Sequence, residues 1–418
     1  MKDKLKDITP FGIFIFFVTG GFLLYLLFTC KSGSTVTDFF MMENTDLAFC
    51  DLKMHINFVS EPKQLYFSMP FAGAGCFPPL AYFIYYCFCR LLSWLGARPG
   101  RDMDIDEMSY TNLLVVYYSI FVAILILVAV CIWGKNMKRG LILFIALLLT
   151  TPFFAGGMSV ANSTMPVMAA LLIALRLKDA KEAWKREAAL LLIAVCAGMK
   201  IYPAVFGLLY LREKRFKEAA RLTVYGIVLF FCPFAAFGGL TGMMKWLDNV
   251  RETMGYCNFG RIQCIKELLY TLGSAAGIEL PGLVLSIIPL LFLGLMIFLA
   301  ATGKDKYRRV FFLCAVMAFY PTSAYRYTLC YLAIPFIMYF MEKEEERKLG
   351  PMLWLECVSF TLLYALPVLY GLLLGFRLNY DYYTLTYVEI WLYVWAYLLL
   401  ILVTVHEFSE RKRNRKAL

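Results

Sequence analysis

Residues 112–134 read NLLVVYYSIFVAILILVAVCIWG and contain no charged side chain. A helix needs about 20 consecutive apolar residues to cross the hydrocarbon core of a bilayer. A stretch of this length and composition therefore predicts a transmembrane helix. Similar apolar stretches recur along the whole chain, so the sequence predicts a membrane protein that crosses the bilayer many times.

The overall composition supports this class. The 418 residues are 61% hydrophobic and 17% charged, whereas soluble domains average about 45–50% and about 25%. Because lipid-facing and buried positions must both be apolar, we expect residues 1–418 to form one membrane-embedded domain, an all-α bundle of about 11–13 spans. The apolar segments lie near 11–29, 77–96, 112–134, 140–156, 160–177, 187–211, 220–239, 281–302, 308–321, 327–341, 351–375 and 386–406.

The net charge of +11 comes from lysines and arginines clustered beside these segments, as in 178–186, 212–218, 303–309 and the tail 408–418. An excess of lysine and arginine marks cytoplasmic loops. We therefore predict a multi-pass plasma-membrane protein whose N- and C-termini are cytoplasmic. The lipid bilayer explains the positive charge, and no nucleic-acid partner is expected.

If each apolar segment crosses the membrane once, successive loops alternate between the cytoplasm and the outside. This places two basic stretches, 135–139 and 212–216, outside, where basic loops are not expected. The second mismatch disappears if 187–211 dips into the membrane and returns. The turn would lie near Lys200-Ile201-Tyr202-Pro203, because proline disfavours helical geometry in the residue before it. A similar irregularity between 77 and 111 would repair the first mismatch.

Two long loops, 31–76 and 240–280, fall on the outer side in this topology. Both mix charged and aromatic residues with short apolar runs, a composition typical of amphipathic helices on a membrane surface. Long loops in compact proteins usually carry function. We therefore expect the chemistry of the protein to involve these two segments.

Cysteine and histidine give no metal signature. Most of the 13 cysteines lie inside apolar runs, where they behave as small apolar residues. The two histidines, His55 and His406, are far apart in the sequence. We expect no metal cofactor, although Asp38 with Asp46 or Asp51 could in principle hold a divalent ion.

Among the polar residues in or beside apolar segments, Asn162, Lys200 and Arg326 are the candidates for function, while Glu356 and Glu389 lie near span ends and are expected to have structural roles. Ionisable residues inside membranes usually face a protein cavity. Each residue also has a plainer interpretation. Lys200 could snorkel from a helix end, Arg326 could anchor a span at the interface, and Asn162 could cap a helix.

Four short motifs, each weak alone, follow one another along the chain: TDFF at 37–40, FPPLAY at 77–82, Asn162 after the glycines at 156–157, and KIYP at 200–203 before a basic loop. In this order and spacing the chain resembles the polyprenol-phosphate-sugar-dependent glycosyltransferases of the GT-C superfamily, specifically the mannosyltransferase-like group. The stretch SAYRY at 323–327 lacks the histidine that this group often has there, so the resemblance assigns no histidine role and leaves the donor sugar open.

The resemblance implies transfer of a sugar from a polyprenyl-phosphate donor to a hydroxyl of a glycan or glycolipid acceptor on the extracytoplasmic face, with inversion. Asp38 matches the family's catalytic aspartate and would be the general base, with Asp46 and Asp51 as rivals in the same loop. Fixed cations would stabilise the departing phosphate. The phosphate-binding residues would be Lys200, Arg326 and Arg261, and the substrate pocket would include Asn162, Tyr202, Pro78, Pro79, Asp46 and Asp51.

Three other functions compete with this one. A transporter or flippase of lipid-linked sugars would show two halves with broken helices at corresponding positions, but the sequence shows one break and no convincing repeat. A polysaccharide polymerase or ligase would lack the ordered motifs. A purely structural membrane subunit would not need long polar outer loops.

Overall fold

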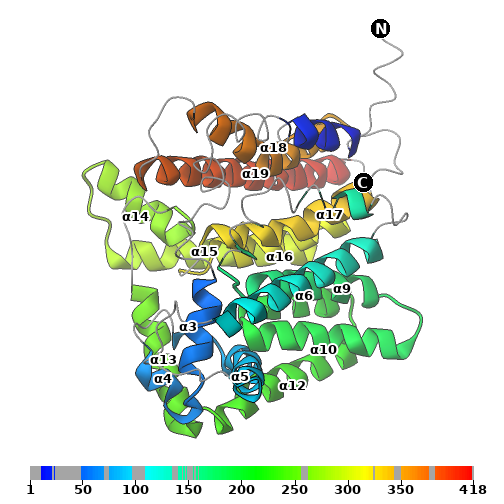
Figure 1. Cartoon of the computed structure of the whole chain (residues 1–418). Coiled ribbons are helices and arrows are strands. Elements are labelled where there is room, and N and C mark those ends of the chain that lie inside the picture. The colour runs from blue at the N-terminus through cyan, green and yellow to red at the C-terminus, as the bar shows by residue number, and fades with distance from the viewer. Residues whose placement is uncertain are drawn as a thin grey trace.

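The computed structural model describes residues 11–20, 23, 49–69, 75–96, 109–133, 140–143, 145, 147, 154, 157–158, 160–255, 262–322, 325–342, 350–375 and 382–416. In these ranges the regular structure is entirely helical (Figure 1). In chain order, with η for a 3-10 helix, the elements are α3 (Cys50–Phe58), η3 (Pro62–Gln64), α4 (Leu65–Ser68), α5 (Pro79–Trp94), α6 (Ser109–Trp133), α9 (Thr164–Leu177), α10 (Ala183–Met199), η6 (Tyr202–Phe206), α11 (Gly207–Arg212), α12 (Phe216–Phe231), η7 (Cys232–Ala235), α13 (Gly239–Gly255), α14 (Ile265–Ala275), α15 (Gly282–Thr302), α16 (Lys306–Phe319), η8 (Arg326–Leu332), α17 (Ala333–Glu342), α18 (Pro351–Gly375) and α19 (Tyr382–Lys416).

Several of these helices have the length and composition of membrane spans. Four segments of the described chain are long and apolar enough to cross a bilayer: Leu113–Trp133, Phe216–Ala235, Gly282–Thr302 and Leu392–Arg413. Shorter apolar helices accompany them, among them Thr164–Leu177 and Pro351–Tyr364. The predicted all-α polytopic membrane fold is confirmed, while the span count of about 11–13 stays a prediction.

The long helices pack side by side in two connected groups (Figure 1). In one, α10 packs between α9 and α12, and α6 packs on α9. In the other, α15 packs on α16 and α18 on α19, and η8 after α16 contacts α9. The contact between α9 and η8 brings together parts of the chain that lie more than a hundred residues apart.

The segment 187–211 turns back on itself, as the sequence predicts. Helix α10 ends at Met199, and Lys200 has an extended backbone with φ −144° and ψ 126°. Pro203 then sits in the first turn of η6, where its missing N–H removes no helical hydrogen bond. After α11, Glu213 accepts a hydrogen bond of 2.7 Å from Lys178 Nζ, just before α10. The hairpin therefore begins and ends on the same side of the bundle.

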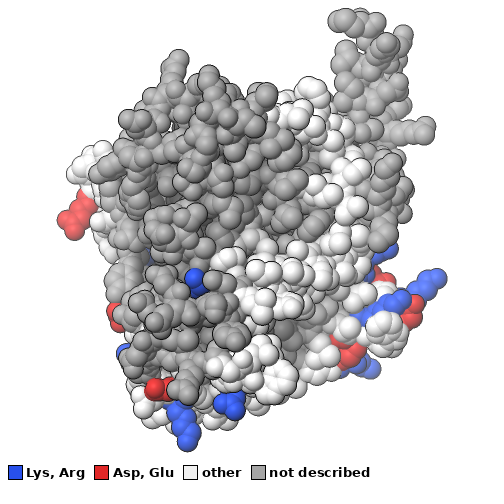
Figure 2. Space-filling model, viewed as in Figure 1, with Lys and Arg blue, Asp and Glu red and all other residues white. Residues whose placement is uncertain are grey.

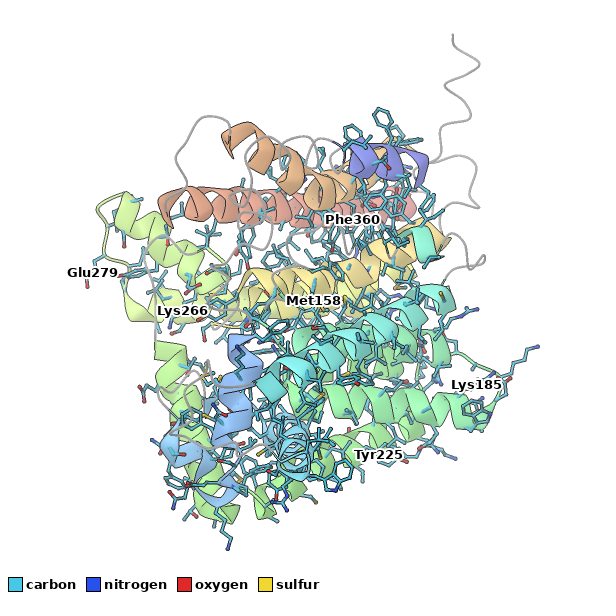
Figure 3. All side chains as sticks on the ribbon, in the orientation of Figure 1. Met158, Lys185, Tyr225, Lys266, Glu279 and Phe360 are labelled. Atoms are coloured by element: carbon cyan, nitrogen blue, oxygen red, sulfur yellow. The ribbon has the colours of Figure 1, made fainter. Side chains whose placement is uncertain are left out.

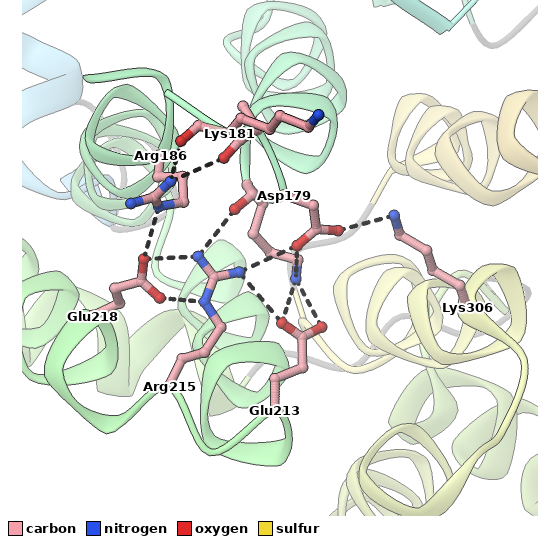
Figure 4. A network of polar contacts seen from close by, with 9 residues as sticks. Asp179, Lys181, Arg186, Glu213, Arg215, Glu218 and Lys306 are labelled. Atoms are coloured by element: carbon pink, nitrogen blue, oxygen red, sulfur yellow. Dashed lines mark hydrogen bonds and ion pairs between the residues drawn. The ribbon is translucent and has the colours of Figure 1, made fainter. Parts of the chain in front are cut away.

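An ion-pair network ties three loops together on that side (Figure 4). Asp179 lies 2.8 Å from Lys178 Nζ, 3.1 Å from Arg215 Nη1 and 3.1 Å from Lys306 Nζ. Lys178 and Asp179 come from the α9–α10 loop and Arg215 from the α11–α12 loop, while Lys306 is the first residue of α16, directly after the α15–α16 loop. We call this side of the bundle the basic end. In Figure 2 the charged side chains at the right-hand edge belong to this end, where Figure 3 labels Lys185.

The two long loops contain helices, as predicted, and these helices touch each other. Helix α13 buries Gly242, Trp246, Asn249 and Thr253, a spacing that places them along one helical face. Asn249 Nδ2 donates to the carbonyl of Tyr66 at 3.1 Å, and Trp246 Nε1 donates to that of Cys76 at 3.0 Å. Figure 3 shows Lys266 and Glu279 of the second loop at the edge opposite Lys185.

Candidate active site

Lys200 is buried at the break after α10, with 8% of its surface exposed. Its Nζ donates to Asn162 Oδ1 at 2.9 Å and to Thr164 Oγ1 at 2.7 Å. A snorkelling lysine would place its amine at the membrane surface, but this amine points into the protein. The placement of Lys200 therefore favours a functional cation over an interfacial one.

Asn162 connects Lys200 to two other elements. Its Nδ2 donates to Asp51 Oδ2 of α3 at 2.7 Å and to Tyr327 Oη of η8 at 3.2 Å. Its Oδ1 also accepts from the backbone N–H of Thr164 at 3.0 Å. The side chain thus organises the start of α9 and the polar group at once. We call Asp51, Asn162, Thr164, Lys200 and Tyr327 the Lys200 group.

The backbone just before Asn162 is strained. Ala161 has φ +52°, in the left-handed region that L residues with a side chain rarely adopt. Such a residue costs about 1–3 kcal/mol, and such strain gathers at functional sites. Figure 3 places Met158, just before this turn, in the middle of the molecule. The unfavourable backbone conformation of Ala161 is therefore part of the turn that positions Asn162.

Aromatic rings enclose the amine. Lys200 Nζ lies 5.3 Å from the ring centre of Phe77 and 5.5 Å from that of Tyr327, distances at which a cation is attracted to a ring face. Phe77 is held there by Pro78 and Pro79, both buried, which form the N-cap and first residue of α5. The rigid prolines therefore position a wall of the site.

His55, one turn after Asp51 on α3, attaches this helix to α5. Its ring stacks on Tyr85 at 4.9 Å and contacts Phe77 and Tyr82 edge-on at 5.1 and 5.4 Å. Burial, and then the charge of Lys200, lowers the pKa of His55 from 6.5 to about 3. The imidazole is therefore neutral at physiological pH and serves to hold Asp51 in place.

We predict a pH dependence of stability from His55. Its folded pKa lies below its unfolded value, so the unfolded chain binds a proton first as the pH falls. Stability should be complete above pH 6.5 and should decline toward the folded pKa of about 3, by at most about 1.4 kcal/mol per pH unit. Thermal unfolding in detergent between about pH 7.5 and about pH 5 measures this slope. His55→Phe should flatten it, and equal slopes in both proteins would refute the assignment.

The other sequence-predicted residues have different positions. Tyr202 opens η6, two residues after Lys200, and is half-buried. Arg326 is the first residue of η8, and its backbone adjoins that of Tyr327. Asp38, Asp46 and Arg261 lie outside the described residues. The structure therefore brings together Asp51, Asn162 and Lys200 from the predicted set, beside Phe77, which Pro78 and Pro79 position.

Sequence reasoning did not identify Thr164, Tyr327 or His55 as site residues. Thr164 could have been found from its distance of two residues to Asn162, which suits a local side-chain turn. His55 is four residues after Asp51 and so shares its helical face. Tyr327 gave no sequence signal, because its contact with Asn162 spans 165 residues.

The arrangement can hold an anion. A lysine ammonium has three N–H donors, and within the described residues Asn162 and Thr164 accept two of them. Among the described residues none accepts the third, so this part of the chain leaves one donor for a phosphate oxygen, which a buried cation stabilises strongly because water is scarce. In the described ranges no group of three or more His, Cys, Asp or Glu residues has metal-binding geometry.

Comparison with known proteins assigns the family. No curated protein and no solved structure matches the chain. Residues 105–323 match glycosyltransferase family 87, a range that includes Asn162, Thr164 and Lys200. The match covers more than half of the 418 residues and agrees with the GT-C resemblance, and of the four motifs it includes Asn162 and KIYP at 200–203. It does not test the narrower resemblance to the mannosyltransferase-like group. The chain therefore belongs to glycosyltransferase family 87, a GT-C-type family of membrane glycosyltransferases.

Proposed function

We propose that this membrane glycosyltransferase takes its sugar from a polyprenyl-phosphate donor and transfers it, with inversion, to a hydroxyl of a glycan or glycolipid acceptor. The observation that carries the proposal is the Lys200 group, in which a buried ammonium is joined through Asn162 to a carboxylate from the first long loop. The cation suits a lipid-linked phosphate, and the loop supplies carboxylates. Resemblance to the mannosyltransferase-like group makes mannose the first donor sugar to test.

The position of the Lys200 group supports an extracytoplasmic site. Lys178 follows the last residue of α9 and belongs to the basic end, whereas Thr164 begins the same helix. Likewise α10 starts beside the basic end and finishes at Met199, directly before Lys200. Its 17 residues span about 25 Å. If the basic end is cytoplasmic, as positive loops usually are, the Lys200 group faces the other side of the membrane.

The proposed chemistry is a single displacement. The acceptor oxygen attacks the anomeric carbon opposite the phosphate oxygen, the carbon–phosphate-oxygen bond breaks, and its electron pair leaves on the phosphate. Lys200 stabilises the charge that develops there. The acceptor proton passes to a carboxylate, for which Asp38 is the candidate from the family motif. The reaction as proposed uses no metal ion.

Asp51 takes a different role in this scheme. One of its oxygens already accepts a hydrogen bond from Asn162, and the next turn of α3 is held by His55. We assign Asp51 as a positioning residue that orients Asn162 and, through it, Lys200. Asp46, in the same loop, is the alternative base should Asp38 prove dispensable.

A turnover assay tests the function. Purified protein in lipid nanodiscs, given a polyprenyl-phosphate sugar and an acceptor extract, should release polyprenyl phosphate and a glycosylated acceptor. The transporter alternative predicts movement of the intact donor across a vesicle membrane without bond cleavage. The polymerase or ligase alternative predicts growth of a sugar chain on its lipid. Either of these outcomes without single-sugar transfer would contradict the proposal.

A further inference from the structure

A groove runs along the outside of the α10–α11 hairpin. Its volume is about 410 Å³, within the range of about 300–1,000 Å³ typical of ligand pockets. Its walls come from α10, η6, α11 and α12, and Thr223 is its one polar lining residue. Small residues leave the space open, among them Ala197, Gly207 and Gly226.

The groove faces lipid. It is lined by α12, which contains the candidate membrane span Phe216–Ala235. Its rim residues Ile201, Ile227 and Phe231 are 45%, 53% and 48% exposed. Apolar side chains are exposed to this degree on a span because hydrocarbon surrounds them. The groove is therefore suited to a hydrocarbon chain.

The ends of the groove relate it to both functional regions of the protein. Ile201, which follows Lys200 directly in the sequence, lines one end. Leu211 and Ala219, from the side of the basic end, line the other. The groove thus runs along the hairpin, from the residue next to the phosphate-binding cation toward the opposite membrane face. A lipid whose phosphate binds at the Lys200 group would extend its chain in this same direction, toward the opposite membrane face.

We propose that the groove binds the first isoprene units of the polyprenyl chain of the donor. This inference rests on the proposed function, because it places the donor phosphate near Lys200. Nothing holds a bulk lipid at one position on the bundle. A chain whose phosphate binds Lys200, by contrast, starts next to Ile201, which lines the groove. Binding of the chain raises affinity for the lipid carrier independently of the sugar.

Gly226 offers a variant that fills the groove without disturbing the fold. A Cβ atom at Gly226 would meet no atom within 4 Å, so a larger side chain projects into open space. Val224, also on α12 and 55% exposed, does not line the groove and provides the matched control. Gly226→Phe and Val224→Phe both add an aromatic ring to the lipid-facing surface.

Donors of different chain length test the proposal. In the wild type, KM should be lower for an undecaprenyl-phosphate sugar than for a methyl-phosphate sugar, which has no isoprene unit to bind in the groove. Gly226→Phe should raise the KM for the long donor about tenfold, which corresponds to lost contact for about two methylene groups. The short donor and Val224→Phe should show no change. An unchanged long-donor KM in Gly226→Phe would overturn the inference while leaving the proposed function intact.

Photo-crosslinking distinguishes the donor chain from an ordinary bilayer lipid and needs no turnover. Undecaprenyl phosphate carrying a diazirine near its phosphate should label α12, and unlabelled undecaprenyl phosphate should compete. Competition by phospholipid alone would show that the groove takes bilayer lipid, and this would overturn the assignment. If no donor is turned over but the label still reaches α12, the groove stands and the proposed function fails.

Discussion

Asp38→Asn should reduce sugar transfer by about a hundred- to ten-thousand-fold, because asparagine cannot accept the acceptor proton. Donor binding should be unaffected, since the substitution removes a base and not a phosphate ligand. Single-turnover transfer from a radiolabelled polyprenyl-phosphate sugar measures the first effect, and donor binding measured separately gives the second.

Asp51→Asn is the matched control, because it removes a carboxylate from the same loop at a position with a different role. We expect it to raise the donor KM more than it lowers kcat, and Asp51→Glu to recover part of the loss. If Asp38→Asn keeps its turnover and either Asp51→Asn or Asp46→Asn loses it, the base must be reassigned accordingly.

Lys200→Met should weaken donor binding by about 1–3 kcal/mol, through loss of a charge-assisted hydrogen bond to the phosphate. The loss should be the same for donors with different sugars, because Lys200 meets the phosphate and not the sugar ring. Titration of the purified protein with undecaprenyl phosphate, which carries no sugar, measures this loss without turnover.

Lys178→Met provides the control for Lys200. Lys178 is also a buried lysine, 1% exposed, but it belongs to the basic end and pairs with Glu213. Its loss should lower the unfolding temperature and leave donor affinity unchanged. Equal donor affinity in wild type and Lys200→Met would mean that Lys200 has only a structural role.

Sequence reasoning predicted the features that depend on local pattern. The length and composition of the apolar segments predict the helices. Pro203, three residues after the isolated Lys200, predicts the turn between α10 and α11. The same reasoning selected Lys200 and Asn162 as candidates, because ionisable residues within membrane spans usually face a protein cavity and because both residues fit motifs of the GT-C resemblance. These inferences require only residues that are close together along the chain.

The contacts of the site depend on packing between distant elements. Asp51 and Asn162 are 111 residues apart in the sequence, and their hydrogen bond requires α3 to lie across the start of α9. That placement follows from the aromatic packing of His55 on Tyr85 of α5, which no periodicity reveals. For this reason Asp51 could not be distinguished by sequence from the other candidate carboxylates of its loop.

The most direct test is a structure of the protein in nanodiscs with bound undecaprenyl phosphate. We predict a phosphate oxygen about 3 Å from Lys200 Nζ, at the end of the bundle opposite Lys178. Phosphate density at the basic end, or a Lys200 amine still enclosed by Asn162 and Thr164 with the lipid bound elsewhere, would contradict the account.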